Sequence, residues 1–197
     1  APDARDMYPQ QPLTRFAFGP LGEVMEGACR PGHFSGVAMV VLKLFHILQP
    51  QKAYFGQKDL QQFKIIERLV KDTSLPVTLR MLPIVREPSG LALSSRNQRL
   101  SDKGKLVAAR IYQALQEAAR ELTVGRNIAR SVAAAQQHLA ASPGIETEYL
   151  TWVNTDDLQP VEHISNHDQL ALCFAGYVEG VRLIDNIIVD IHADRSS

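Results

Sequence analysis

The sequence predicts an α/β fold in which a parallel-sheet unit is followed by a small α+β unit. Strand-like and helix-like patterns alternate over residues 53–82 with short connections, and this alternation is typical of a parallel sheet with helices on its faces. After residue 97, two helical patterns precede three strand-like runs. The chain has 197 residues, of which 45% are hydrophobic, so it can bury the core of one large or two small domains.

The first unit is expected to contain four elements after a Pro-rich, extended lead-in at residues 1–20. They are a helix at Gly36–Leu48, a buried strand at Ala53–Phe55, a helix at Asp59–Lys71 and a strand at Val77–Leu82. Ser35 is placed to cap the first helix, and Asp59 is placed to cap the second. His46 lies in the apolar first helix, so we expect it in the core or at an interface.

The second unit is expected to begin near residue 85, which divides the chain into domains at 1–84 and 85–197. Its expected elements are helices at Asp102–Leu122 and Ile128–Ala141 and strands at Glu146–Val153, Gln169–Val178 and Val181–Ile188. Ser101 is placed to cap the first of these helices. Asp185 and Asn186 are expected to cap or turn the last strand.

The composition argues against several classes of protein. Lysine plus arginine balances aspartate plus glutamate at 21 each, which is not the charge of a nucleic-acid groove. These residues include no signal peptide and no apolar span of about 18 residues, so we expect a cytoplasmic protein without a membrane partner. Cys29 and Cys173 make no disulfide framework, and Cys173 is expected to be a buried free thiol. His163, His167 and His192 are expected to be solvated loop residues, and no metal site is expected.

Two loops hold donors that suit an anion. The segment Ile84–Asn97, here called the Ser-Arg loop, offers the hydroxyls of Ser94 and Ser95 and the guanidinium of Arg96, and such donors suit phosphate oxygens. Lys58 precedes a helix, whose N-terminus favours anions. Both loops leave the carboxyl ends of strands, where parallel sheets bind ligands, so we expect them to converge. By residue type alone, a solvated turn and a helix cap are alternative interpretations.

Three longer segments carry a resemblance to a known family. They are EG-x-x-RPGHF-x-GV at Glu26–Val37, YFG-[EQ]-KD-x-QQ at Tyr54–Gln62 and VRE-x-[DS]-GLA-[LM]-SSRN at Val85–Asn97. With the closing block Val181–Ile187, they make the chain resemble the AMP-forming pantoate–β-alanine ligases, or pantothenate synthetases, over almost its whole length. The resemblance implies that residues 1–84 are the remainder of a Rossmann-like nucleotide- and pantoate-binding domain of the class I tRNA synthetase-like nucleotidyltransferase kind. It implies that residues 85–197 are an α+β lid domain.

The activity implied by the resemblance is the ATP-dependent condensation of pantoate with β-alanine. In that family pantoate and ATP form a pantoyl adenylate, and β-alanine then displaces AMP to give pantothenate. The resemblance also implies Mg²⁺ and a homodimer. Such chemistry asks the protein for positioning and charge neutralisation rather than for a covalent nucleophile.

The resemblance assigns roles to named residues. It implies that ATP is bound by the residues Gly56, Gln57, Lys58, Asp59, Val85, Leu93, Ser94, Ser95 and Arg96. Among these, Lys58, Ser94, Ser95 and Arg96 are the implied catalytic residues, because they stabilise charge on the triphosphate. Gln62 is implied to bind pantoate, whereas its neighbour Gln61 is expected to face elsewhere. Arg30 and His33 form a candidate substrate loop, and a turn-stabilising role is an equal alternative for both.

One family hallmark, His-x-Gly-His, does not occur in these 197 residues. We therefore expect the chain to correspond to the C-terminal two-thirds of the enzyme and to lack full activity by itself. The alternative is a non-catalytic nucleotide-binding or interaction module derived from the same fold. We also expect Pro88–Asn97 to be a lid that is mobile without nucleotide, because Leu91, Ala92 and Leu93 alone offer little area to bury. Arg86 is expected either to serve this loop's ligand or to satisfy a surface turn.

Overall fold

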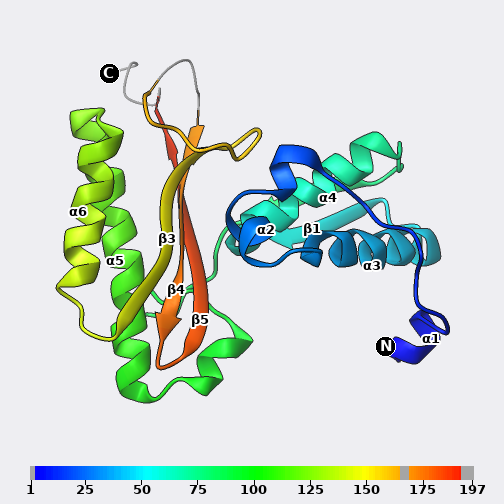
Figure 1. Ribbon diagram of the computed structural model, residues 1–197, viewed down its shortest axis with the longest axis horizontal. Coiled ribbons are helices and arrows are strands. Elements are labelled where there is room, and N and C mark those ends of the chain that lie inside the picture. The colour runs from blue at the N-terminus through cyan, green and yellow to red at the C-terminus, as the bar shows by residue number, and fades with distance from the viewer. Residues whose placement is uncertain (1–2, 165–168, 192–197) are drawn as a thin grey trace.

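The computed structural model describes residues 3–164 and 169–191 and contains two sheets (Figure 1). The α-helices are α1 (Ala4–Met7), α2 (Met25–Cys29), α3 (His33–Leu48), α4 (Leu60–Asp72), α5 (Asp102–Gly125) and α6 (Ile128–Ala140). The 3-10 helices are η1 (Gly19–Gly22), η2 (Gln57–Asp59) and η3 (Ser95–Arg99). The strands are β1 (Lys52–Gly56), β2 (Thr78–Leu82), β3 (Ile145–Asn154), β4 (Gln169–Val178) and β5 (Val181–Asp190).

The first sheet is the parallel pair that the βαβ pattern predicts. Strands β1 and β2 run parallel from Lys52 opposite Thr78 to Gly56 opposite Leu82, and α4 connects them. Helix α4 turns its apolar stripe inward, with Phe63, Ile65, Ile66 and Leu69 buried, as its 3.6-residue periodicity requires. Strand β1 differs from the prediction of a buried strand, because its side chains alternate between exposed and half-buried.

The second sheet is antiparallel, in the order β3-β4-β5, and is covered on both faces. Helices α5 and α6 pack on one face, and the first unit lies against the other (Figure 1). In β4, Leu172 and Phe174 face the helices, whereas Ala171 and Cys173 meet Leu60 of α4. This alternation follows from the two-residue period of a strand, and it explains why the sequence of β4 is one continuous apolar run. The predicted α/β architecture is confirmed.

Helix α5 begins where the sequence predicts, at the cap Ser101. The Ser101 hydroxyl accepts a hydrogen bond from the amide of Gly104 at 3.0 Å. Glu179, in the β4–β5 turn, accepts two more, from the Ser101 amide at 2.9 Å and from its hydroxyl at 2.6 Å. These bonds lower the pKa of Glu179. A carboxylate at a helix N-terminus complements the helix dipole, so the hairpin and the helix are joined at this point.

Several local predictions in the first unit are wrong. Helix α3 begins at His33 rather than Gly36, after Gly32 in a left-handed conformation (φ +79°), and the Ser35 hydroxyl instead accepts a hydrogen bond from the Phe16 amide. His46 is exposed, which excludes the core position, whereas a position at an interface between subunits stays a prediction. The lead-in at residues 1–20 is interrupted by the short helices α1 and η1.

Other predictions about single residues are confirmed or fall outside the described part of the chain. Cys173 is buried, and burial raises its pKa to about 12. His163 is exposed, whereas His167 and His192 lie outside the described residues. Within residues 3–164 and 169–191, no helix has the length and apolar character needed to cross a membrane.

We expect Ser131→Ala to lower the free energy of unfolding by about 1–3 kcal/mol. Ser131 is fully buried in α6, where its hydroxyl donates to the Ala118 carbonyl at 2.6 Å and accepts from the Trp152 indole at 3.0 Å. Removing the hydroxyl leaves the buried Trp152 indole N–H without its acceptor and takes one hydrogen bond from the Ala118 carbonyl. Urea unfolding followed by Trp152 fluorescence measures the loss. The control Ser74→Ala, at an exposed position, should change stability by less than about 0.5 kcal/mol, and equal effects would contradict the expectation.

Candidate functional site

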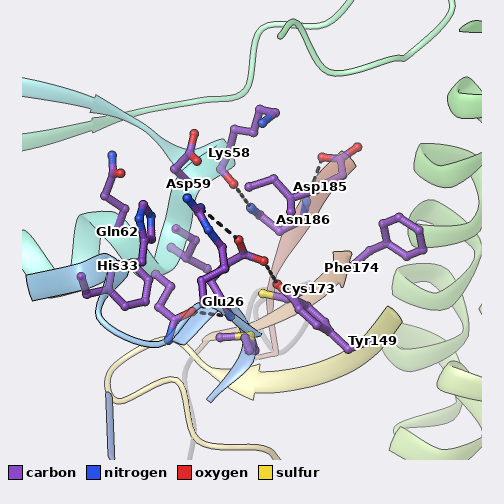
Figure 2. A pocket seen from close by; sticks show the side chains of 16 residues that line it. Glu26, His33, Lys58, Asp59, Gln62, Tyr149, Cys173, Phe174, Asp185 and Asn186 are labelled. Carbon is purple, nitrogen blue, oxygen red and sulfur yellow. Dashed lines mark hydrogen bonds and ion pairs between the residues drawn. The ribbon is translucent and has the colours of Figure 1, made fainter. Parts of the chain in front are cut away.

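A pocket between the two units collects five of the twelve predicted site residues (Figure 2). The predicted residues that line it are Arg30, His33, Lys58, Asp59 and Gln62. Figure 2 shows His33 and Gln62 on the side of the first unit, with Asp185 and Asn186 of β5 across from them. A smaller adjoining cavity is shared by Lys58, Ser94 and Asp185. The two predicted loops therefore do converge.

The remaining predicted residues lie outside the lining of the main pocket. Val85 and Leu93 are largely exposed, at 66% and 51%. Ser95 begins η3, and the Arg96 guanidinium donates to the carbonyl of Arg182 at 3.1 Å. Thus the phosphate-type donors Ser94, Ser95 and Arg96 do not line the main pocket, and Ser94 lines the smaller cavity beside it.

The turn that carries Lys58 is held by β5. Residues Gln57–Asp59 form η2, and Asp59 occupies the N-cap position of α4 without making a side-chain cap bond. The predicted capping role of Asp59 is therefore wrong, and its carboxylate is exposed at the pocket. The Asn186 amide donates to the carbonyls of Gln57 and Lys58, each at 3.0 Å, and accepts from the Gln57 side chain at 3.1 Å. These three bonds fix the backbone at Lys58.

The Ser-Arg loop is anchored through Arg86, which is not a surface-turn residue. Its guanidinium forms a bidentate pair with Asp185, at 2.6 and 2.9 Å, and stacks on the ring of Tyr112 at 3.6 Å. It also donates to the carbonyl of Gly90 at 3.1 Å, inside the loop. Burial raises the pKa of Asp185, and its contacts with Arg86 oppose that rise. Asp185 and Asn186 lie within β5, opposite Phe174 and Cys173 of β4, so the prediction that they end the strand is wrong.

The expectation that this loop buries little area is also wrong. Leu91 and Ala92 are each only 5% exposed, and Leu91 belongs to the main core. The loop also closes on itself, since Arg86 and Ala92 form an isolated antiparallel bridge and the Leu93 amide donates to the Val85 carbonyl. Apolar burial therefore helps to order this segment. Its mobility without nucleotide stays a prediction.

The candidate substrate loop, residues 26–34, is fixed by Glu26, a residue with no role in the sequence-based assignment. Its carboxylate accepts from the Arg182 guanidinium at 2.6 and 2.9 Å and from the Tyr149 hydroxyl at 3.0 Å. Arg182 also pairs with Glu148. Burial acts to raise the pKa of Glu26, but the bonds and charge of Arg182 prevail, so that this pKa lies below its ordinary value.

Gln61 and Gly27 also help to fix the backbone of this loop. The Gln61 amide donates to the carbonyls of Leu21 and Val24, at 2.8 and 2.9 Å, and accepts from the Glu26 amide at 3.0 Å. A Cβ atom on Gly27 would lie 2.0 Å from the carbonyl oxygen of Gly22, so only glycine fits there. Gln61 also lines the pocket, so the expectation that it faces elsewhere is wrong. It is buried and binds the loop backbone, whereas Gln62, on the same pocket, is half-buried.

Arg30, His33 and Cys29 lie near this network. Arg30 is 3.8 Å from the Glu26 carboxylate and 41% exposed, and burial together with the charge of Arg30 lowers the pKa of His33. Neutral His33 can accept or donate a hydrogen bond at the pocket near pH 7. Cys29 is exposed at the end of α2, and partial burial and Glu148 raise its pKa.

The sequence held some signal for the residues that were missed. Glu26, Arg182, Asp185 and Asn186 all lie inside the motif blocks at 26–37 and 181–187, but nothing in their type distinguishes an anchor from a surface residue. Tyr149 lies outside every motif, and only the fold places it beside Glu26.

Comparisons with known proteins cover nearly the whole chain. The family model described as "Pantoate-beta-alanine ligase" matches residues 1–188. A pantothenate synthetase of Cytophaga hutchinsonii is 47% identical over 189 residues, which are 95% of this chain and 67% of the relative. A bifunctional pantoate ligase/cytidylate kinase of Synechococcus elongatus is 44% identical over 190 residues, which are 94% of this chain and 36% of the relative.

Solved structures give the same picture. The pantothenate synthetase of Thermus thermophilus is similar with a TM-score of 0.89 and 41% identity, over 94% of this chain and 67% of that one. The pantoate-β-alanine ligase of Francisella tularensis, complexed with "Beta-gamma ATP" and β-alanine, has a TM-score of 0.69 and 33% identity, over 93% of this chain and 61% of that one. The chain thus spans about two thirds of the length of the Cytophaga and Thermus relatives.

We expect Glu26→Gln to lower the free energy of unfolding at pH 7 and to flatten its dependence on pH. Breaking a buried ion pair costs at most about 3–5 kcal/mol, less here because Glu148 still pairs with Arg182. A carboxyl whose pKa is depressed by folding stabilises the fold above its unfolded pKa, about 4.3 for glutamate. That stability is lost as the pH falls through the folded pKa, and the variant lacks this contribution. Urea unfolding from pH 7 to pH 3 measures both effects.

The control is Glu67→Gln, which removes a 50%-exposed partner of Lys64. It should change stability by less than about 1 kcal/mol. If the wild type and Glu26→Gln lose stability with the same slope below pH 5, the role assigned to Glu26 is wrong.

Proposed function

Because the chain belongs to the pantoate–β-alanine ligase family, we propose that it carries the machinery of an ATP-dependent condensation of pantoate with β-alanine. The observation that carries this proposal is the convergence of Lys58, Gln62 and His33 on one pocket, with Ser94 in the cavity beside it. The ligase from Francisella tularensis, complexed with an ATP-type ligand and β-alanine, supports both as substrates.

The proposed reaction has two steps, and the protein supplies no covalent nucleophile. A carboxylate oxygen of pantoate attacks the α-phosphorus of ATP, forming pantoyl adenylate as the bond to pyrophosphate breaks. The β-alanine ammonium loses one proton to solvent, and the neutral amine attacks the acyl carbon. The nitrogen then loses a second proton to solvent as the bond between the acyl carbon and the phosphate oxygen breaks, so that AMP leaves with that oxygen and the pantothenate amide forms. Both steps need fixed geometry and neutralised charge.

The proposed residue roles are those that the family resemblance implies, and the positions of Lys58, Gln62 and Ser94 support them. Lys58, Ser94, Ser95 and Arg96 would neutralise the triphosphate, because a compact ammonium, hydroxyls and a guanidinium are good phosphate donors. The backbone at Gly56, Gln57, Asp59, Val85 and Leu93 would line the rest of the nucleotide. Gln62, one helical turn beyond Lys58, would hold pantoate, since an amide bonds a hydroxyl and a carboxylate together. Arg30 and His33 would face the same substrate.

Mg²⁺ fits this site as a companion of ATP. Magnesium usually binds through substrate phosphates and one or two carboxylates. The exposed carboxylate of Asp59, beside Lys58 at the pocket, meets that requirement. When bound, the ion would neutralise part of the triphosphate charge.

We propose the wider organisation that the family suggests. Residues 1–84 would be the nucleotide- and pantoate-binding part and residues 85–197 the lid, in a cytoplasmic homodimer. The division is supported by the change from a parallel to an antiparallel sheet across the Ser-Arg loop. The competing function, a non-catalytic nucleotide-binding module, predicts ATP binding without any condensation.

We expect Lys58→Ala, in the complete product of the gene, to slow pyrophosphate release by about 10²–10³-fold, as for loss of one transition-state donor. The pantoate KM should stay nearly constant, because Lys58 is proposed to bind the phosphates of ATP, whereas Gln62 is proposed to bind pantoate. Pre-steady-state measurement of pyrophosphate separates the two effects. Lys71→Ala, an exposed lysine in the last turn of α4, is the control. Unchanged release with only a raised pantoate KM would show that Lys58 is wrongly assigned.

The 197-residue chain by itself should not form pantothenate and should bind ATP weakly. It contains no His-x-Gly-His segment, which the family resemblance makes part of the phosphate site, and each lost donor costs about 2.7–4 kcal/mol in the transition state. AMP release dependent on pantoate and β-alanine is the assay, with the complete gene product as the positive control. Release at a comparable rate by the 197-residue chain would overturn this expectation.

A further inference from the structure

Two consecutive residues of β5 hold the two loops on which the proposed phosphate donors lie. Successive side chains of a strand point to opposite faces, so Asp185 and Asn186 reach different partners. Asn186 bonds the turn that carries Lys58, and Asp185 bonds Arg86 at the root of the Ser-Arg loop. Both contacts are long-range in the sequence. Arg86 and Asp185 are 99 residues apart, and Lys58 and Asn186 are 128 residues apart.

The partners of Asn186 require both the donor and the acceptor of a side-chain amide. It is 3% exposed, its NH₂ group donates to two consecutive carbonyls, and its oxygen accepts from the Gln57 side chain. An aspartate of the same shape cannot donate, and its charge would face two carbonyl oxygens. The bond to the Lys58 carbonyl sets the direction in which the Lys58 side chain leaves the turn.

Asp185 acts on the other loop through Arg86. The carboxylate is buried, with a side-chain exposure of 7% against 16% for the guanidinium. Arg86 also donates a hydrogen bond to the carbonyl of Gly90, which lies four residues before Ser94. Asp185, Ser94 and Lys58 line one small cavity, so the strand sets how far apart the two donors lie.

We propose that Asp185 and Asn186 are positioning residues that keep Lys58 and Ser94 in register for one triphosphate. The geometric part of the proposal rests on the contacts above, and its consequence for rate rests on the proposed function. A misplacement of about 1 Å costs on the order of 10²-fold in rate. The loss should fall on kcat for adenylate formation and leave the pantoate KM within about twofold, because Gln62 lies on α4 beyond the clamped turn.

The test uses Asn186→Asp and Asp185→Asn in the complete gene product. Hydrogen exchange without ligand, read by mass spectrometry, should become at least about tenfold faster in residues 56–62 for Asn186→Asp and in residues 88–97 for Asp185→Asn, consistent with local opening of less stable units. Each variant should leave the other segment nearly unchanged. The matched control is Asn127→Asp, whose side-chain oxygen accepts from the Arg130 amide at the N-cap of α6. Aspartate keeps that bond, so this control should alter neither segment.

Each outcome decides one part. Unchanged exchange in both segments would overturn the clamp, and so would equal acceleration of both in either variant. If hydrogen exchange becomes faster only in the expected segment while kcat is unchanged, Asp185 and Asn186 have a structural role only, and the proposal that they position the phosphate donors is overturned. If the wild-type gene product forms no pantothenate, the proposed function fails while the exchange result still decides the clamp. Should Asn186→Asp fail to fold, Asn186→Ala removes the two donors without adding charge, and the same exchange and kcat criteria apply to it.

Discussion

Strand β5 is the element on which the candidate site depends, because three of its side chains hold three separate loops. Arg182 binds Glu26 of the candidate substrate loop, and Asp185 and Asn186 bind the loops described above. The strand can do this because β4 pairs along its whole length and fixes its register from Val181 to Asp190. A slip of one residue would exchange the faces of all these side chains. The register in which β5 pairs with β4 therefore determines the geometry of the polar site.

The ion pairs at this strand serve geometry more than stability. Moving charged groups out of water costs about as much as their attraction returns, so buried pairs contribute little net stability. Arg86–Asp185 and Arg182–Glu26 are both largely buried, yet each has the bidentate form that fixes direction. The stability of the second unit comes instead from its apolar core, in which Trp152, Phe174 and Leu115 are fully or almost fully buried.

The fold class followed from the sequence because it depends on patterns that are local. The strand–helix–strand alternation at 53–82 and the cap at Ser101 are short-range signals, and both appear in the structure. The boundaries of α3 did not follow, because Gly32 in a left-handed conformation lets the helix begin three residues early. The convergence of Lys58 with Ser94 also followed, because strand ends of a parallel sheet share one edge.

The anchors of the site could not be predicted from residue type. Arg86 and Asp185 are 99 residues apart, and no local pattern pairs a loop arginine with a strand aspartate. Leu91 and Ala92 failed as a prediction for the same reason, because the surface that buries them is built by the second unit. Which side chains far apart in the sequence form pairs depends on tertiary packing, and the local periodicity of the sequence does not determine that packing.

The unequal exposure of the two thiols has a practical consequence for spectroscopy. Cys29 is exposed at the end of α2, three residues after Glu26, whereas Cys173 is buried in the pocket wall with a raised pKa. Only the thiolate reacts with alkylating reagents, so a maleimide dye at mildly alkaline pH should label Cys29 and spare Cys173. Within these 197 residues, Cys29 is therefore the thiol suited to carry a fluorophore or spin label beside the candidate substrate loop, without any engineered cysteine.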